Sequence, residues 1–196
     1  MKKLALAALL ASAFTVSHAA IVTFDDLASG PAVANGYAGL NWNNFYVLNG
    51  STDQNSGYQN GVVSANNVAF NAFAAPASVS ATSSAGFDLY SAYFTAAWTN
   101  GLQIRADATF ENNTTASITF TANEAGPVNE VFGWNDLSSV TFTSFGGTQV
   151  EGVNGQGNHF ALDSLSTAAA VPEPGNVALL VAGLGLMGVV ARRRKI

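Results

Sequence analysis

The stretch Leu102–Glu111 reads LQIRADATFE, and its apolar and polar residues alternate without a break. Leu102, Ile104 and Phe110 mark one face, which two alanines complete, while polar or charged side chains occupy the positions between them. Successive side chains of a β-strand point to opposite faces, so a period of two is typical of a strand with one buried face. The stretch therefore predicts a half-buried β-strand.

The chain around this stretch repeats the same kind of pattern. Turn-forming clusters separate the apolar runs, and Asn100-Gly101 between two such runs predicts a hairpin turn. Eight or nine short strands without an amphipathic helix favour an all-β fold, an antiparallel β-sandwich, over residues 20–165. The further predicted strands are Ile21–Phe24, Leu40–Leu48, Val62–Phe70, Tyr90–Trp98, Ala116–Thr121, Val128–Trp134, Val140–Thr143 and His159–Leu165.

The first 19 residues have the order of a secretory signal peptide. Lys2 and Lys3 form a positive start, Leu4–Val16 is an apolar run, and Ser17-His18-Ala19 is a cleavage site with small residues at its first and third positions. The apolar run is too short for a spanning helix but suits a signal helix. We expect signal peptidase to cleave after Ala19 and the body to be exported.

The charge of the predicted body is strongly negative. Eleven acidic residues face a single base, Arg105, between Ala20 and Val171, which gives a net charge of −10. Such a surface repels phosphate backbones and has no basic patch, so nucleic acid is excluded as a partner. The chain also has no cysteine, which excludes disulfides, thiol nucleophiles and cysteine metal sites and leaves stability to the hydrophobic core.

The C-terminal part differs in composition from the body. Residues 166–170 are small and predict a short linker, which Val171-Pro172-Glu173-Pro174 follows. Val177–Ala191 then has no polar side chain and predicts a transmembrane helix. The cluster Arg192, Arg193, Arg194 and Lys195 is expected to hold the C-terminus in the cytoplasm, because positive charges near a span stay inside.

These three elements in this order, over residues 171–196, resemble the PEP-CTERM sorting signal of Gram-negative bacteria. The resemblance implies that exosortase, an integral-membrane enzyme, processes the tail and that Pro172, Glu173 and Pro174 are its recognition element. It also implies export across the inner membrane, transient anchoring, and then a place at the cell surface or outside it. Proteins of this kind often accompany exopolysaccharide production, so an association with exopolysaccharide or biofilm is expected.

The two ends of the body resemble the jelly-roll sandwiches of galactose-binding-like and carbohydrate-binding modules. Phe24-Asp25-Asp26-Leu27 opens the first strand, and the last runs through Asp163. The resemblance implies that the first and last strands lie together and that Asp25, Asp26 and Asp163 hold a structural calcium ion. Ser164 stands where related sequences often have another ligand. The alternative is that these acids cap turns at strand ends.

The body shows little that favours catalysis. It contains neither a Gly-x-Ser-x-Gly nor a His-Glu-x-x-His motif, and its acids are scattered among predicted loops. Its three tryptophans, Trp42, Trp98 and Trp134, are candidates for a sugar-stacking platform, but the core is their default assignment, because a sandwich interior needs large residues. We therefore expect a protein that is not an enzyme: first a surface or matrix protein, then a carbohydrate-binding module, and last a small glycosidase that would draw on Glu111, Glu124, Glu130 or Glu151.

Overall fold

A computed structural model describes residues 19–169. The expected signal peptide, apart from Ala19, and the expected sorting tail lie outside the described residues. Within residues 19–169, none of the helices is long and apolar enough to cross a membrane.

Twelve strands and four short helices make up the described body. The helices are η1 (Tyr37–Gly39), η2 (Gly50–Thr52), α1 (Gly57–Asn60) and η3 (Ala72–Ala74). The strands are β1 (Ala20–Val22), β2 (Leu40–Asn43), β3 (Phe45–Asn49), β4 (Asn67–Asn71), β5 (Ala77–Ala81), β6 (Phe87–Ala96), β7 (Thr99–Asn100), β8 (Leu102–Phe110), β9 (Thr115–Ala122), β10 (Val128–Phe145), β11 (Thr148–Gln149) and β12 (Phe160–Ala169).

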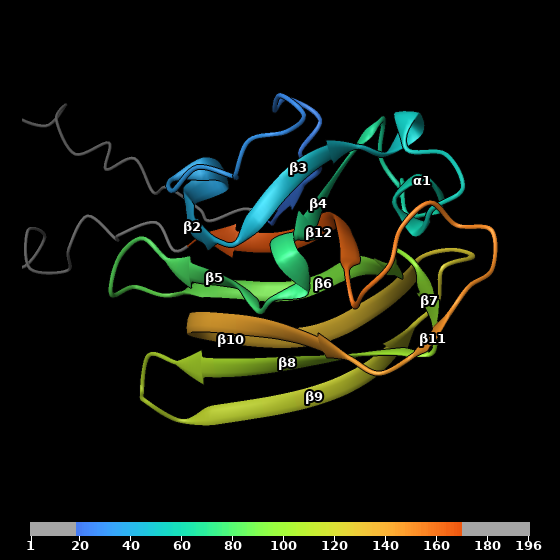
Figure 1. Ribbon diagram of the computed structural model, residues 1–196. Coiled ribbons are helices and arrows are strands. Elements are labelled where there is room, and N and C mark those ends of the chain that lie inside the picture. The colour runs from blue at the N-terminus through green and yellow to red at the C-terminus, as the bar shows by residue number, and fades with distance from the viewer. Residues whose placement is uncertain (1–18, 170–196) are drawn as a thin grey trace, which may run out of the picture. The chain divides into compact units, whose positions relative to one another are not determined.

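The strands form two layers that share β10. The first half of β10 pairs with β6, and β12, β4 and β3 follow, with β1 beside β4 on β12. The second half of β10 lies between β5 and β8, which β2 and β9 extend. All of these pairs are antiparallel, and Figure 1 shows β8 and β9 at one side of the molecule and β3 and β4 at the other. The expected antiparallel, jelly-roll-like sandwich is confirmed, including the pairing of first and last strands.

β10 changes layers where its backbone is irregular. Its register against β6 shifts twice, between Val131 and Trp134 and between Trp134 and Leu137. Gly133 and Asp136 have positive φ angles of 62° and 58° there. Bulges bend a strand and increase its twist, so one 18-residue strand can serve both layers.

Phenylalanine rings fill the space between the layers. Phe94 of β6 lies 5.3 Å from Phe142 of β10 and 4.9 Å from Phe120 of β9, measured between ring centroids. Phe45 of β3 and Phe160 of β12, which also belong to the first layer, contact Phe142 as well. These rings join the two layers into one core, as the apolar face of each strand requires.

The structure corrects several boundaries. The predicted strand Leu40–Leu48 is two strands, because Asn44 has a φ of 59° and turns the chain between β2 and β3. Residues 166–169 are not a linker, since they continue β12 against β6 and β1. The predicted hairpin at Asn100-Gly101 is also wrong: β6 and β8 do not pair, because β10 lies between them. The alternation of Leu102–Phe110 is confirmed, with Leu102, Ile104, Ala106 and Ala108 buried.

Candidate functional site

The carboxylate of Asp163 is buried in β12 and surrounded by hydrogen-bond donors. Its residue is 1% exposed. The backbone N–H groups of Val63 and Ser64 donate to Oδ2 at 2.7 and 2.8 Å, and the Ser64 hydroxyl donates to Oδ1 at 2.8 Å. The backbone N–H of Ser164 also donates to Oδ1. Asp163 thus holds the loop before β4 against the last strand.

Asp25 and Asp26 contact other partners. The backbone N–H of Asn67 donates to Asp25 Oδ1 at 3.0 Å, and the Tyr37 hydroxyl donates to Asp26 Oδ1 at 2.6 Å. Burial, together with the bond to Asp26, raises the pKa of Tyr37, so the phenol stays protonated and keeps donating. Each of these two acids ties the segment after β1 to one neighbouring element.

These residues do not fit a calcium site. Calcium needs six to eight oxygen ligands with free lone pairs. Both oxygens of Asp163 instead accept N–H and O–H donors, and Asp26 faces a phenol. Within residues 19–169 there is also no group of three or more His, Cys, Asp or Glu side chains that could hold a metal. Asp25 and Asp26 agree with the alternative, acids at a strand end, whereas Asp163 lies within β12 and holds a loop.

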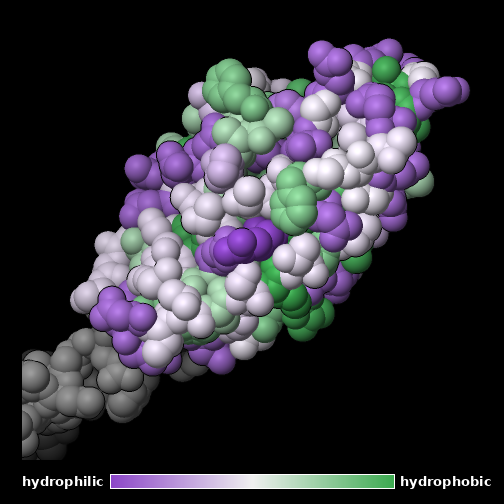
Figure 2. All heavy atoms as spheres, turned by 60° about the horizontal axis from the view of Figure 1, so that its bottom comes forward, coloured by the Kyte–Doolittle hydropathy of each residue, from purple (hydrophilic) through white to green (hydrophobic). Residues whose placement is uncertain are grey.

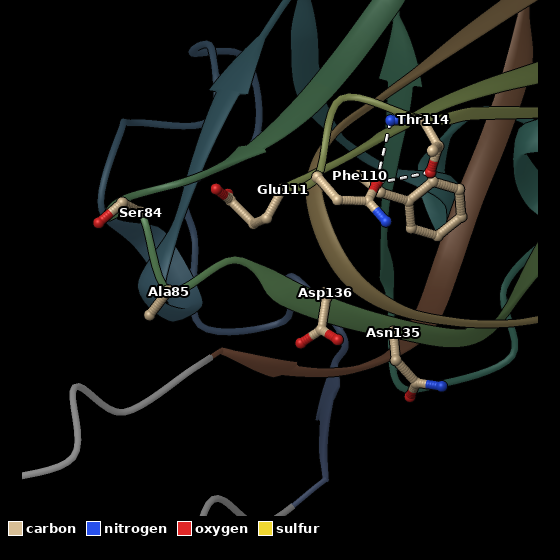
Figure 3. Close-up of a pocket in the computed structure, with 8 residues that line it drawn as sticks. Ser84, Ala85, Phe110, Glu111, Thr114, Asn135 and Asp136 are labelled. Carbon is tan, nitrogen blue, oxygen red and sulfur yellow. Dashed lines mark hydrogen bonds between the residues drawn. The ribbon is translucent and has the colours of Figure 1, made fainter. Parts of the chain in front are cut away.

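An open hollow of about 520 Å³ lies at the turn after β8, next to the loop between β5 and β6. Figure 3 shows Glu111 extending toward the loop that carries Ser84 and Ala85, while Asp136 lies on the neighbouring segment below it. The backbone N–H of Glu111 donates to the Asp136 carbonyl at 2.8 Å, which fixes the two acids beside each other. The hollow is rich in hydrogen-bond acceptors and suits hydroxyl or amine donors; Phe110, Asn112, Thr114 and Asn135 complete its lining.

The four acids considered for a glycosidase do not gather at one place. Glu111 lines the hollow, and Glu124 accepts a hydrogen bond from the Asn60 amide at 2.8 Å. Glu130 lies in the first half of β10, and Glu151 lies in the turn after β11. Burial raises the pKa of Glu130, but this residue is not among those that line the hollow. The second acid of the hollow, Asp136, was missed by the sequence analysis, since only the bend in β10 brings it to Glu111.

The tryptophans do not form an exposed platform. Trp42 and Trp98 are 5% and 8% exposed, so their assignment to the core is confirmed. Trp134 is only partly buried and packs against the main core from its edge. Trp98 belongs to a second, smaller hydrophobic cluster. Its ring centroid lies 5.2 Å from that of Tyr58 of α1.

A different aromatic group lies on the outer side of the first layer, with Phe73 exposed and Tyr46 and Phe70 partly buried. Phe73 is 83% exposed, and its ring lies 6.4 Å from that of Tyr46, which lies 6.1 Å from Phe70. Phe73 has a φ of 58°, and the Asn44 amide holds its turn by donating to the carbonyls of Ala72 and Pro76 at 3.0 and 3.1 Å. We call Phe73, Tyr46 and Phe70 the aromatic row. Periodicity could not predict this row, because Phe73 lies in a turn.

The residues expected to direct sorting lie outside the described residues: Pro172, Glu173, Pro174 and the cluster Arg192, Arg193, Arg194 and Lys195. Residues 170–195 match the model of the PEP-CTERM protein-sorting motif. The chain carries a PEP-CTERM motif. This match covers the tripeptide, the apolar run and the basic cluster together, and it confirms the resemblance of the tail.

Several solved structures are similar to this chain over most of its length. A DUF4465 family protein from Bacteroides caccae has 13% identity and a TM-score of 0.49 over 78% of this chain and 100% of that one. TmCBM61, solved with β-1,4-galactotriose, has 9% identity and a TM-score of 0.43 over 69% and 94%. The CBM22 tandem domain of Paenibacillus barcinonensis Xyn10C has 12% identity and a TM-score of 0.43 over 85% and 49%. None of the curated proteins matches the chain significantly.

Proposed function

We propose that this chain is an exported surface protein of a Gram-negative bacterium that exosortase sorts through its PEP-CTERM tail. The observation that carries the proposal is the motif match over residues 170–195. The N-terminal signal peptide supplies the export step, with signal peptidase as its partner, and leaves the body outside the inner membrane.

The physical properties of the tail support a segment that is held and then cut. Its apolar run of 15 residues spans about 22 Å as a helix, less than the roughly 30 Å of a hydrocarbon core. Pro172 and Pro174 restrict the backbone to extended conformations that a protease-like cleft can bind, and Glu173 offers one charge between them. The four cations after the run keep the C-terminus inside until processing.

Deleting the exosortase gene tests this proposal. The tail-bearing chain should then stay in the membrane fraction, and mass spectrometry should recover peptides that run through Met187. Replacing Pro172, Glu173 and Pro174 together by alanine should have the same effect in the parent strain, whereas Val171→Ala, just outside the tripeptide, should leave processing intact. Equal processing with and without exosortase would refute the proposal.

The aromatic row supports a second candidate function, glycan binding by the body. Exposed rings stack on the apolar faces of pyranose rings, and a strained, firmly held turn that presents an aromatic side chain is typical of a functional site. The net charge of −10 disfavours acidic polymers. The candidate ligand is therefore a neutral glycan, such as the exopolysaccharide of the host or another biofilm polymer.

A glycan array that includes the host's own polymer tests this candidate. Phe73→Ala should lower binding at least tenfold, while Val131→Ala, which removes an apolar group that is 67% exposed on β10, should leave it unchanged. EDTA should not alter binding, because the acids of the body do not fit a calcium site. Binding to no glycan, or equal binding by both variants, would remove this candidate.

A further inference from the structure

The edges of the two layers are protected unequally. An edge strand exposes unpaired N–H and C=O groups that can pair with another chain, and proteins guard against this with short, covered, bulged or charged edges. In the first layer, the segment before η1 covers β3: Gly30 N–H donates to the Val47 carbonyl at 2.8 Å and Val33 N–H to that of Phe45 at 2.8 Å. β1, which pairs with β12 on the same side as β4, is only three residues long.

Two further edges are guarded in other ways. β2 has four residues, and its Trp42 N–H donates to the Asn35 side chain at 2.8 Å. The first half of β10 has a strand partner on one side only, β6, within the described residues. It carries Glu130 and shifts its register twice against β6, so this edge strand is charged and bulged. Both are devices that prevent pairing with a foreign strand.

β9 has none of these protections. It is eight residues long, and it pairs with β8 from Thr115 to Ala122 without a register shift. Its sequence, TASITFTA, holds no charge, proline or glycine. Among residues 19–169, β8 is its only strand partner, and none of the other hydrogen bonds reaches the backbone of 115–122. In Figure 1, β9 is the outermost strand at the bottom.

The surface around this edge is locally neutral although the body is acidic. Arg105 and Asp107 on β8, the nearest charges of that face, form an ion pair at 2.7 Å. The outward side chains of β9 are Thr115, Ser117, Thr119 and Thr121, all exposed. Figure 2 brings this side of the molecule forward, and pale side chains of intermediate hydropathy cover much of it. Charge repulsion at the edge itself is thus small.

We propose that β9 pairs antiparallel with β9 of a second copy of this chain. Directly opposite residues of an antiparallel pair share a face, so a pair centred on Ile118 sets Ser117 opposite Thr119 of the second copy and Thr115 opposite Thr121. Ala116 and Phe120 then meet on the core side. Hydroxyls face hydroxyls and apolar groups face apolar groups, so the strand is complementary to itself, as a two-fold interface requires.

The pairing closes after two copies. A two-fold interface uses the same strand of both copies, and the other edges of the described body are short, covered or bulged. The expected assembly is a dimer in which the second layer continues from one copy into the other. This inference goes beyond sorting and does not depend on it, since the folded body alone provides the strand.

Disulfide cross-linking tests the register, because the chain has no cysteine of its own. Ser117→Cys and Thr119→Cys chains, produced together and oxidised, should form a covalent dimer, since opposite Cβ atoms in such a pair lie about 4.5–5.5 Å apart. Ser80→Cys is the control: it lies on the outer face of the same layer, but in β5, between β2 and β10. Cross-linking of Ser80→Cys to an equal extent would overturn the proposal.

A charge variant tests the association itself by sedimentation of the full-length chain in mild detergent. Thr119→Glu sets a carboxylate opposite Arg105 on β8, which preserves the fold, and places two like charges across the new interface. It should raise the dissociation constant at least tenfold, whereas Ser80→Glu, with the same change of net charge, should not. A wild-type chain that stays monomeric at every concentration, or that pairs only with another protein, refutes the proposal.

Discussion

The carboxylate of Asp163 binds donors that lie up to 100 residues away in the sequence. A carboxylate that accepts several backbone N–H groups satisfies donors that would otherwise stay unpaired in a buried loop. The role of the Asp163 carboxylate is therefore structural. It holds residues 63–64 against β12 and thereby positions the start of β4. A bound cation would compete with these donors for the same oxygens.

Asp163→Asn should lower the free energy of unfolding by about 3 kcal/mol, because an amide nitrogen would then face the N–H groups of Val63 or Ser64 and leave a buried donor unpaired. Urea unfolding followed by tryptophan fluorescence measures the loss. Asp26→Asn, which affects one exposed bond, should cost less than about 1 kcal/mol. The midpoint should be the same in EDTA and in calcium; a rise in calcium would show that an ion binds after all.

At the scale of elements, the sequence predicted those strands whose alternation is unbroken. Leu102–Phe110 is the clearest, since one face packs on the core along its whole length. The alternation could not reveal that Val128–Trp134 and Val140–Thr143 are parts of one strand, because bulges at Gly133 and Asp136 interrupt the period where the strand changes layers. The order of the strands could not be predicted for a related reason. Asn100-Gly101 indicates a turn, but it does not indicate that β10 lies between β6 and β8.

The same limit explains the outcome for the candidate site. The tail was predicted from local order alone, because a tripeptide, an apolar run and a basic cluster are read along the chain. The hollow and the aromatic row depend on contacts between distant segments, such as Glu111 with Asp136 or Asn44 with the turn of Phe73. The local pattern of residues along the chain does not predict contacts between such distant segments.

The docking of α1 depends on a glycine. A Cβ on Gly57 would lie 1.7 Å from the carbonyl oxygen of Ala96, at the end of β6, and backbone cannot move aside as a side chain can. Gly57→Ala should therefore cost about 3 kcal/mol of unfolding free energy and loosen Tyr58 from Trp98. Gly126→Ala, where a Cβ meets open space, should change stability by less than about 0.5 kcal/mol. Urea unfolding and Trp98 fluorescence distinguish the two; equal losses would contradict the close approach.

For the whole molecule, the pairing of the first and last strands determines where the chain enters and leaves the body. Ala20 lies opposite Thr167, so both ends of the described body lie at the same end of the sandwich. The segments expected to carry the signal peptide and the sorting tail are therefore joined to the body at neighbouring strands.

The net charge of −10 on the body opposes its compactness and its pairing. One base cannot balance eleven acids, and the Debye length falls from about 30 Å at 0.01 M salt to about 8 Å at 0.15 M. Raising sodium chloride from about 0.01 to 0.15 M should therefore raise the thermal midpoint and also lower the dissociation constant of the dimer, since screening reduces repulsion within and between copies. Thermal melts and sedimentation across this range measure both effects. Replacing two exposed acids away from β9, Glu151 and Asp136, by their amides should mimic part of the salt effect at low ionic strength. A dimer that dissociates as salt rises would mean that ion pairs hold it, and an uncharged β9 edge has none to offer.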